Sequence, residues 1–597
     1  MIKPSQNTTS TRSLNFVKMA ARGISQRDET LPTEGGQRTE FDFDDFDHSS
    51  IPFEKDELPV VVIGSSMIGM SLQLFLGFHG IKSVAFDRHP STATRQRAAL
   101  FQLRTIEIFR QLGLEEAFRE ESETVFDLDG GILLTDALYQ GKTLSIVQGS
   151  DPKKIAQISP CTRLWLTQDM YEPWVRERAK EVGSKQFFKT RVVHYEENAD
   201  HVVVVVQDID SGKYRKYKTK FLIACDGNRS PTRKRENIAW DGPGILGSNI
   251  SIHFKADLKP YLGERSKYGV IYVNNPNISG FWRLDSSSKS GFLGIQSVKG
   301  RDKFEPGSVT AKLAREYFQS AAELPDGIDI ELEAVSYFTM AAYNSERYTS
   351  AGKRVILAGD AAHVMPPTGA MGGNTGIQDV YNLAWKLAYV LDDKASIGLL
   401  DSYNVERVPS SGWTVNQAYS RWVRRVIKDE TVPHDKELPD ETCELGYRYP
   451  QGAIITEGPV DPTDLWEDPF SPRADVGSRL LHKVLEGASG KTISSLDLVK
   501  RNFVILTTSA TSPWLDAARQ QDFEIDAVSV TRTSQPVKDP SGGFAEALKL
   551  QNGQALLIRP DGYIAWRSPV SADNPADELA TVLQKLLRPD VKNNAHL

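Results

Sequence analysis

The chain has 597 residues, more than one hydrophobic core usually serves, so two or three domains are expected. A formal net charge of −7 gives no reason to expect a nucleic acid or an anionic membrane as partner. No apolar run approaches the ~18 residues that an integral membrane helix needs. The cysteines, Cys161, Cys225 and Cys443, form no close pair, which excludes a disulfide framework and a zinc or other metal spacing and favours the reducing cytoplasm.

The first 27 residues differ in composition from the rest of the chain. They contain lysine and arginine but no acidic residue, together with many serines and threonines. This composition is compatible with a mitochondrial transit peptide, but a disordered tail, or a start at Met19, explains it more simply. Residues 40–47 then alternate acids with phenylalanine and are interpreted as solvated. Residues 1–57 are therefore expected to form a disordered or targeting leader.

The first ordered elements predict a doubly wound α/β fold. Residues 60–63 are a short β-branched run, which is typical of a buried parallel strand. A helix is expected over about 69–79, and residues 83–86 have the pattern of a second strand. This strand–helix–strand order is the usual start of a dinucleotide-binding domain.

Two later regions predict antiparallel strands. Residues 202–206 and 214–218 flank Ser211-Gly212 and predict a hairpin. From about residue 250 to 337, short segments rich in β-branched and aromatic residues follow one another. They predict a separate antiparallel layer, with strands at 269–273, 281–284 and 292–298.

The C-terminal half predicts a return to the first fold and then a further unit. A strand is expected at 354–358 and a long helix at about 376–391. The proline- and acid-rich stretch 432–472 has the composition of a linker. A last α/β segment is expected over about 496–587.

A glycine-bounded loop follows the first strand. It contains Gly64, Ser66, Met67, Ile68 and Gly69. Gly64 would form the tight turn, Gly69 would let helix and strand pack closely, and the helix N-terminus would bind a pyrophosphate. Ser66 replaces the middle glycine of the usual pattern, so the loop is an imperfect match. A carboxylate, Asp87, ends the second strand, where it can accept hydrogen bonds from ribose hydroxyls.

Two later motifs place an aspartate beside a glycine after a buried strand. Asp226-Gly227 follows a strand at 221–224. Gly359-Asp360 follows the strand at 354–358 and leads into a glycine-rich segment that ends near Asn374. Together with the first loop, in this order, the motifs resemble the three fingerprints of the group A flavoprotein aromatic hydroxylases. That is the family of para-hydroxybenzoate hydroxylase and phenol 2-monooxygenase, and the resemblance covers about residues 58–425.

The resemblance implies that the chain binds FAD, and it gives roles to individual residues. Asp87 would bind the adenosine ribose, Arg97 the pyrophosphate, and Gln168 the ribityl and ring region. Asp360 would accept from a ribityl hydroxyl, while Asp226 would belong to a motif used for FAD and for the transient nicotinamide cofactor. The cofactor-binding set implied is Gly64, Ser66, Met67, Ile68, Gly69, Asp87, Arg97, Gln168, Asp226, Gly227, Asp360, Pro367, Gly372, Gly373 and Asn374.

The glycines of residues 369–374 would pass close to the pyrimidine edge of the flavin, where side chains would clash. A helix beginning near Gly376 would point its positive end at that edge.

Several of these residues also have a plainer interpretation. Asp226 and Asp360 could cap helices or form turns. Arg104 and Glu107 are interpreted as helix-surface or packing residues. We interpret His363 as structural rather than as a catalytic base.

The C-terminal region resembles a subgroup of the same family. Residues 477–482 and 559–567 are similar to the thioredoxin-like extension of phenol hydroxylases and polyketide hydroxylases. No cysteine follows Cys443, which excludes a thiol-redox role and favours packing or the support of a homodimer.

The fold class expected is α/β, with a doubly wound FAD-binding domain, an antiparallel-sheet substrate layer and a C-terminal thioredoxin-like domain. The expected boundaries are 1–57 for the leader, 58–245 with 341–425 for the FAD-binding domain, 246–340 for the substrate layer, 426–490 for a linker and 491–597 for the C-terminal domain.

The resemblance implies a monooxygenase acting on a small phenolic or polyketide-derived substrate. NADPH or NADH would reduce FAD, and dioxygen would form a flavin C4a-hydroperoxide that attacks an electron-rich ring carbon. A phenol is activated by losing its proton, so an acceptor near it is expected. Some phenol hydroxylases have an aspartate two residues after the position of Arg97, where this chain has Ala99. No catalytic side chain can be assigned; His253, Tyr272 and Arg283 in the substrate layer are weak polar candidates.

Other outcomes use the same motifs. Oxygen insertion beside a ketone, as in a Baeyer–Villiger reaction, and epoxidation need the same cofactor, and only the product separates them from hydroxylation. A flavin reductase without oxygenase activity is a further alternative. The cysteine content argues against the reduction of disulfides, but not against other reductase activities. A plain NAD-binding protein would have no use for Asp360 and the glycine loop after it.

Overall fold

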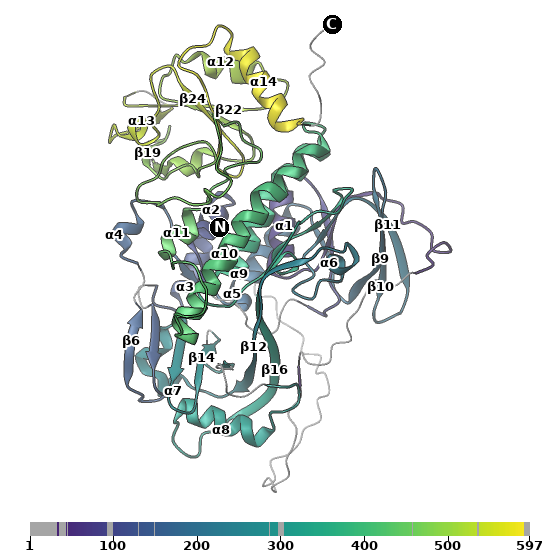
Figure 1. The fold of residues 1–597 in the computed structure, drawn as a ribbon, viewed down its shortest axis with the longest axis vertical. Coiled ribbons are helices and arrows are strands. Elements are labelled where there is room, and N and C mark those ends of the chain that lie inside the picture. Colours follow the sequence, from purple (N-terminus) through teal and green to yellow (C-terminus); the bar gives the residue numbers. More distant parts are fainter. Residues whose placement is uncertain are drawn as a thin grey trace.

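The structure is a computed structural model of the chain. It describes residues 33–34, 43, 46–91, 100–128, 131–147, 150–285, 287–296, 304–456, 458–533 and 536–589. The predictions for residues 1–27, for much of 40–47, and for Arg97 and Ala99 lie outside these ranges. Figure 1 shows the C-terminal unit at the top, a long-stranded sheet at the bottom, and helices α9 and α10 running between them.

The first sheet has the predicted strand–helix–strand start. Its strands run in the order β8-β3-β2-β11-β10-β9, and β17 pairs with β11. The strands are β2 (Leu58–Ile63), β3 (Ser83–Phe86), β8 (Lys185–Phe187), β9 (Thr190–Glu197), β10 (Val202–Asp208), β11 (Tyr214–Ala224) and β17 (Val355–Leu357). Helix α1 (Met67–Phe78) follows β2 directly and packs against α5 (Gln168–Glu181) and α9 (Met371–Leu391).

Strand β11 of this sheet pairs with both antiparallel and parallel neighbours. The predicted hairpin is present, with β10 antiparallel to β11. The strand predicted separately at 221–224 is the continuation of the same β11, which there pairs in parallel with β2 and β17. The hairpin strand predicted at 214–218 and the strand predicted at 221–224 are therefore parts of one continuous element, β11.

Two helices begin earlier than predicted. Helix α1 begins at Met67 instead of Gly69, and α9 begins at Met371 instead of Gly376. The glycines at 372, 373 and 376 therefore lie inside the first turns of α9, although glycine is unfavourable in the interior of a helix. Gly376 has a packing reason, since a Cβ there would lie 2.7 Å from Ile68 Cδ1 on α1.

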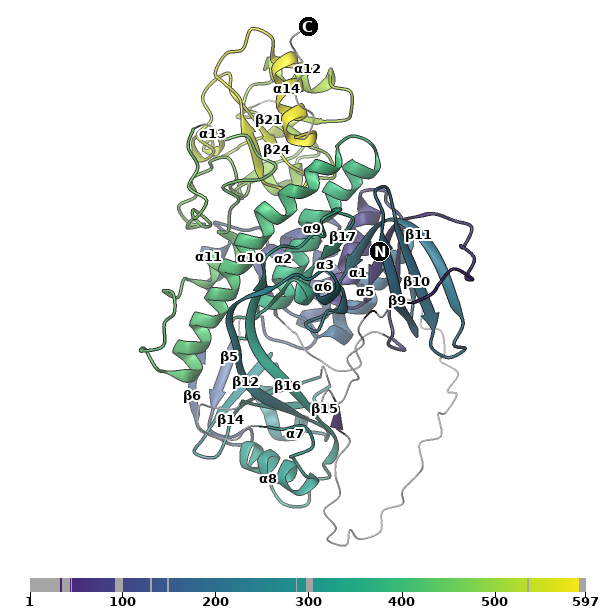
Figure 2. The same ribbon diagram turned by 45° about the vertical axis from the view of Figure 1, so that its right-hand side comes forward.

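The second sheet contains the predicted antiparallel layer. Its strands run in the order β1-β16-β12-β15-β14-β13-β5-β6, with β18 paired to β16. They are β1 (Thr33–Glu34), β5 (Ile132–Thr135), β6 (Thr143–Val147), β12 (Trp240–Lys255), β13 (Val270–Asn274), β14 (Ser279–Leu284), β15 (Ser290–Ile295), β16 (Glu331–Ser345) and β18 (His363–Val364). The sheet is mixed, because β5 arrives from far earlier in the chain and pairs in parallel with β13. Helix α8 (Ala311–Ala322) covers one face, where Phe254, Trp282 and Phe318 pack edge to face (Figure 2).

The third sheet forms the thioredoxin-like C-terminal unit. Its strands run in the order β20-β19-β23-β22-β21-β24-β25. They are β19 (Val484–Glu486), β20 (Thr492–Ser494), β21 (Val504–Thr507), β22 (Asp526–Thr531), β23 (Val537–Lys538), β24 (Ala555–Ile558) and β25 (Ile564–Arg567). Helices α12 (Pro513–Arg519) and α14 (Pro575–Leu587) form a hydrophobic core together with this sheet. The same core includes Trp385 of α9.

The remaining helices and strands connect these units. They are β4 (Leu100–Phe101), α2 (Leu103–Gln111), α3 (Glu115–Glu123), α4 (Pro152–Ile155), β7 (Leu164–Trp165), α6 (Pro231–Arg235), α7 (Lys259–Leu262), α10 (Asp401–Trp422), α11 (Asp440–Leu445) and α13 (Phe544–Ala547). Part of the segment with linker-like composition, residues 442–450, is buried, and Tyr447 and Tyr449 in it lie against Tyr563 of the C-terminal unit.

Buried charges join the C-terminal unit to the helices of the first fold. Glu406 on α10 accepts from Lys386 Nζ of α9 at 2.7 Å and from Arg559 Nη1 of the C-terminal unit at 2.7 Å. All three side chains are fully buried. Arg104 and Glu107 of α2 contribute to the same interface: Arg104 donates to the carbonyl of Asp561, and Glu107 pairs with Arg479. These two residues therefore have the packing role.

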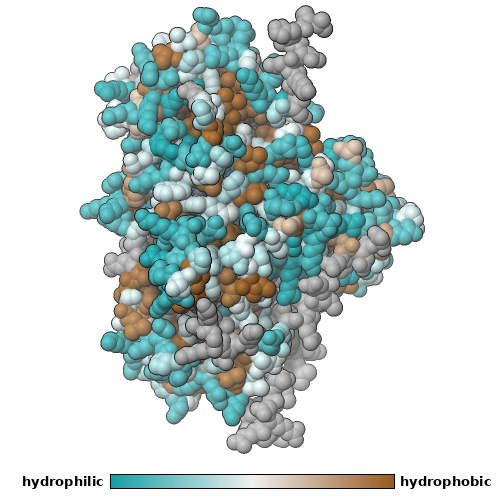
Figure 3. Space-filling view, viewed as in Figure 1, coloured by the Kyte–Doolittle hydropathy of each residue, from teal (hydrophilic) through white to brown (hydrophobic). Residues whose placement is uncertain are grey.

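In the described ranges, none of the helices combines the length and the apolar character needed to cross a bilayer. The face shown in Figure 3 is mainly hydrophilic, with apolar residues scattered over it.

Candidate functional site

A large cavity lies between the first and the second sheet. Its volume is about 1710 Å³, above the ~300–1,000 Å³ of an ordinary small-molecule pocket, so it has room for two ligands. From the first fold, its wall includes Ser66, Met67, Ile68, Gln168, Gly227, Asp360, Pro367, Gly372, Gly373 and Asn374; from the second sheet, it includes Tyr272, Phe281 and Arg283. The remaining described residues of the predicted set, Gly64, Gly69, Asp87, Asp226 and His253, do not line this cavity.

The loop after β2 has the backbone geometry that its glycines predict. Gly64 has φ of +95°, and a Cβ there would lie 2.5 Å from the carbonyl oxygen of Cys225. A Cβ on Gly69 would lie 2.0 Å from the carbonyl oxygen of Gly64. Ser66 is the N-cap of α1, but its side chain makes no capping bond. The first turn of α1 thus presents its amide groups at the cavity wall, where they have no partner within the helix.

Asp87 holds this loop in place. Its Oδ2 accepts from the backbone N–H of Ser65 at 2.7 Å, and its Oδ1 accepts from the N–H of His89 at 2.8 Å. The carboxylate is thus oriented at the end of β3, and its role toward a ribose stays a prediction.

Asp226 is bound to its own turn. Its Oδ2 accepts from the backbone N–H and the hydroxyl of Thr232, while Oδ1 is buried without a hydrogen-bond partner in the described structure. Burial raises the pKa of this carboxyl. The geometry matches the turn-forming interpretation, and the neighbouring Gly227, with φ of +84°, supplies the cavity wall.

A buried charge network supports the Gly359-Asp360 turn from behind. Asp379 Oδ2 lies 2.6 Å from His363 Nε2 and accepts from the N–H of Gly359 at 3.2 Å. Arg407 Nε donates to Asp379 Oδ1 at 2.8 Å. Burial disfavours the charge on Asp379, but attraction to His363 and Arg407 outweighs it and lowers the pKa to about 2. His363 is fully buried away from the cavity, which matches its interpretation as structural.

The second sheet contributes an aromatic face with a cation. Tyr272 on β13 pairs with Phe281 on β14, and Arg283 on β14 pairs with Phe292 on β15. Side chains two residues apart on a strand share a face, so Phe281 and Arg283 point the same way. His253, the third weak candidate, lies next to Phe292, hydrogen-bonds Ser336 at 2.9 Å and does not reach the cavity.

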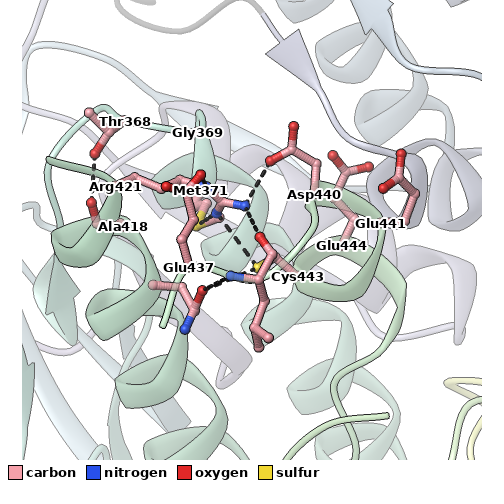
Figure 4. Close-up of polar contacts among 12 residues, drawn as sticks. Thr368, Gly369, Met371, Ala418, Arg421, Glu437, Asp440, Glu441, Cys443 and Glu444 are labelled. Atoms are coloured by element: carbon pink, nitrogen blue, oxygen red, sulfur yellow. Dashed lines mark hydrogen bonds and ion pairs between the residues drawn. The ribbon is translucent and has the colours of Figure 1, made fainter. Parts of the chain in front are cut away.

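Helix α11 adds carboxylates that the sequence analysis missed (Figure 4). Glu444 accepts from Arg163 Nε at 2.8 Å and from the N–H of Leu103 at 3.0 Å, and burial raises its pKa to about 7. Asp440 accepts from Arg421 Nη2 at 2.7 Å. Both carboxylates line the cavity. Their four-residue spacing was the only local signal, because the surrounding composition is that of a linker.

Family models match both parts of the chain. Residues 57–418 match a model described as FAD binding domain, and residues 473–589 match one described as aromatic-ring hydroxylase, C-terminal. The first match alone spans more than half of the chain. The chain belongs to the FAD-dependent aromatic-ring hydroxylases.

Relatives of this hydroxylase match it over nearly their whole length. The 4-methyl-5-nitrocatechol 5-monooxygenase of Burkholderia sp is 38% identical over 543 residues, which cover 89% of this chain and 98% of the relative. The tetracenomycin B2 monooxygenase-dioxygenase of Streptomyces olivaceus is 33% identical over 555 residues, covering 89% and 99%. A crystal structure of aklavinone-11 hydroxylase with FAD and aklavinone matches with a TM-score of 0.81 and 28% identity, covering 89% of this chain and 100% of the other. The hydroxylase is therefore an FAD-dependent monooxygenase, as the sequence predicted.

The cavity of this hydroxylase fits FAD. Gln168 lies in the wall with its Oε1 buried and without a partner in the described structure, as expected of an acceptor for a cofactor hydroxyl. A Cβ on Gly372 would meet nothing closer than Met365 Cγ at 3.7 Å, so the protein itself does not require a glycine there. The side chain of Asn374 binds the backbone of Gln102, Leu100 and Ala370, and its role toward FAD stays a prediction.

Ser66→Gly is expected to leave FAD affinity of the hydroxylase equal or higher. The side chain makes no capping bond that the substitution would remove, and the N-cap accepts glycine at a cost of only a few tenths of a kcal/mol. Removing the Cβ lets the loop backbone approach a phosphate more closely. FAD titration of the deflavinated protein, followed by flavin fluorescence, measures this. A large loss of affinity would show that the loop does not face the cofactor.

Proposed function

We propose that this monooxygenase consumes NADPH or NADH and dioxygen to hydroxylate a small phenolic or polyketide-derived aromatic compound. The observation that carries the proposal is the one continuous cavity, which joins the glycine loops of the first fold to the aromatic face of the second sheet. FAD would lie along the first, with its ring end near Pro367 to Asn374, and the substrate would lie against the second. Bound FAD supplies the activation of dioxygen and the transferable oxygen atom.

The names of the relatives support an aromatic substrate. Their names include a nitrocatechol, tetracenomycins and aklavinone, so the family takes both small phenols and polyketides. The volume left beside FAD in this cavity is compatible with either. The protein groups expected at the reacting ring are Phe281 for stacking and Tyr272 and Arg283 for polar contacts. The domain boundaries given above, the FAD-binding set and a homodimer remain part of the proposal.

The test is a product assay with the purified, FAD-loaded enzyme. NADPH or NADH is added under air, with and without a panel of phenols, catechols, naphthols and anthrones. We expect one ring class to accelerate nicotinamide oxidation and to yield a product heavier by one oxygen atom. Oxidation that no aromatic accelerates, or a lactone or epoxide as product, would instead favour the reductase, the Baeyer–Villiger-type or the epoxidising alternative.

A further inference from the structure

Arg421 is a buried cation that packs against the turn before helix α9 (Figure 4). The turn, residues 368–371, lines the cavity, whereas Arg421 itself does not. Nη1 of Arg421 donates to Met371 Sδ at 3.3 Å, and a Cβ on Gly369 would lie 3.3 Å from the same Nη1. The side chain of Arg421 has no exposed surface. A full positive charge therefore lies directly behind this part of the cavity wall.

The position of the turn depends on the last turns of α10, where Arg421 lies. The hydroxyl of Thr368 donates to the carbonyl of Ala418 at 2.7 Å. On its other side, the turn is held by Gln102, whose Nε2 donates to the carbonyl of Gly369 at 3.0 Å. A change at Arg421 is therefore transmitted to the cavity wall.

The counter-charges of Arg421 are more exposed to water than the arginine. Nη2 donates to Asp440 Oδ1 at 2.7 Å, but the side chain of Asp440 is 54% exposed. Glu437 lies 3.6 Å from Nε and is shared with Arg425. Cys443 lies 3.6 Å from Nη1 and stays neutral, because burial raises the pKa of its thiol to about 11. Since water screens an exposed carboxylate, the charge of Arg421 is only partly neutralised.

Other carboxylates of the cavity wall form no ion pair with Arg421 in the described part of the chain. They are Glu123, Asp127, Asp360 and Glu444. Glu123 and Asp127 are exposed residues at the end of α3 and just after it. The charge behind the turn is therefore set by Arg421 and its two acidic partners, which can be changed one at a time.

We propose that Arg421 is a positioning residue that holds the turn at residues 368–371 against bound FAD and, through its charge, makes the cofactor easier to reduce. Reduction moves a hydride, that is two electrons and one proton, from the nicotinamide cofactor to FAD and leaves the nicotinamide oxidised. The added electrons bring negative charge to the flavin ring, which a cation behind the turn stabilises. The inference deepens the proposed function and rests on its placement of the flavin ring near residues 367–374.

The test is the midpoint potential of FAD bound to the enzyme, measured by equilibrium reduction together with a reference dye. The potential gives the ratio of the affinities for reduced and oxidised FAD, and a tenfold change in this ratio is about 30 mV for a two-electron couple. Arg421→Met should lower the ratio by about tenfold. Arg421→Lys keeps the charge and should recover part of the loss.

Asp440→Asn tests the charge in the opposite direction. Asparagine keeps the shape of the side chain but removes a counter-charge of Arg421. The ratio should therefore rise, by about threefold, because an exposed carboxylate offsets only part of the cation. A merely structural role of the contact predicts no such opposite shift, since both substitutions would loosen the same turn.

Arg424→Met and Glu430→Gln are the matched controls. Their side chains are 45% and 72% exposed, they follow Arg421 closely in the chain, and neither residue lines the cavity. Both variants should keep the ratio within about twofold of the wild type. The flavin absorption of each variant shows that it has folded and holds FAD.

The outcomes separate this role from the proposed function. An unchanged ratio in Arg421→Met, or shifts of the same sign in Arg421→Met and Asp440→Asn, would overturn the role of Arg421 while hydroxylation stands. Equal shifts in Arg421→Met and Arg421→Lys would also overturn it, because the effect would then follow shape and not charge. If the ratios shift as expected but the enzyme forms no hydroxylated product, the proposed function fails and the role of Arg421 toward FAD stands.

Discussion

Arg559→Met is expected to lower the free energy of unfolding by about 3–5 kcal/mol, because it leaves Glu406 buried with only part of its counter-charge. Arg559 donates to both carboxylate oxygens of Glu406, at 2.7 and 2.9 Å, and neither side chain is exposed. Methionine keeps the apolar volume of the side chain, so the decrease in the free energy of unfolding reflects mainly the removal of the charge. Urea unfolding followed by far-UV circular dichroism measures the effect.

The matched control is Arg519→Met in the same unit. Arg519 pairs with Asp516 on the surface at 2.6 Å, and both side chains are more than half exposed. Such a pair contributes little, so a change within about 0.5 kcal/mol is expected. A loss at Arg559 no larger than this would contradict the electrostatic account of the interface.

The same network predicts an acid-sensitive stability. Burial alone would raise the pKa of Glu406, but Arg559 and Lys386 lower it from 4.5 to about 2. A carboxyl whose pKa is depressed in the folded state stabilises it above the ordinary pKa, and this contribution is lost as the pH falls toward 2. In Arg559→Met the pKa of Glu406 should be depressed less, so the stability lost between about pH 4.5 and pH 2, measured by urea unfolding at each pH, should be smaller than in the wild type.

Gly372→Leu is expected to leave the protein folded but to weaken FAD binding by about 10- to 100-fold. Gly372 lies in the first turn of α9 with open space beside it, and leucine favours a helix more than glycine does. The new side chain would extend into the cavity and occupy room that the cofactor needs, an overpacking that costs about 1–3 kcal/mol. FAD titration of the deflavinated variant, with thermal unfolding alongside, separates the two effects.

Gly543→Leu serves as the control for this substitution. A Cβ there meets nothing closer than Ser541 Oγ at 3.8 Å, and the residue lies in the C-terminal unit, away from the cavity. It should retain wild-type FAD affinity. Unchanged FAD affinity in Gly372→Leu would mean that the first turn of α9 does not face the cofactor.

The parts of the fold that follow local rules could be predicted from the sequence. The loop between Gly64 and Gly69 has the predicted geometry, because Gly64 has φ of +95° and a Cβ on Gly69 would meet the carbonyl oxygen of Gly64 within the same strand–helix unit. The hairpin of β10 and β11 follows from two strand-like segments that flank Ser211-Gly212. The three antiparallel segments between residues 269 and 298 were found from their content of β-branched and aromatic residues.

Contacts between distant segments could not be predicted in this way. The pairing of β5 with β13 joins residues more than a hundred positions apart, and no local pattern encodes it. Helix α11 was missed because its acids look solvated in the sequence, whereas Arg163 and Arg421 neutralise two of them in the structure.

The contact between Glu406 and Arg559 limits how this enzyme can exchange parts with its relatives. The two residues are 153 positions apart, on either side of a segment that looks like a convenient crossover point. A chimera that takes its C-terminal unit from another family member inherits the arginine from one parent and the carboxylate from the other. Recombination in this segment, natural or engineered, should therefore succeed only between parents that share both charges, however well the rest of their sequences agree.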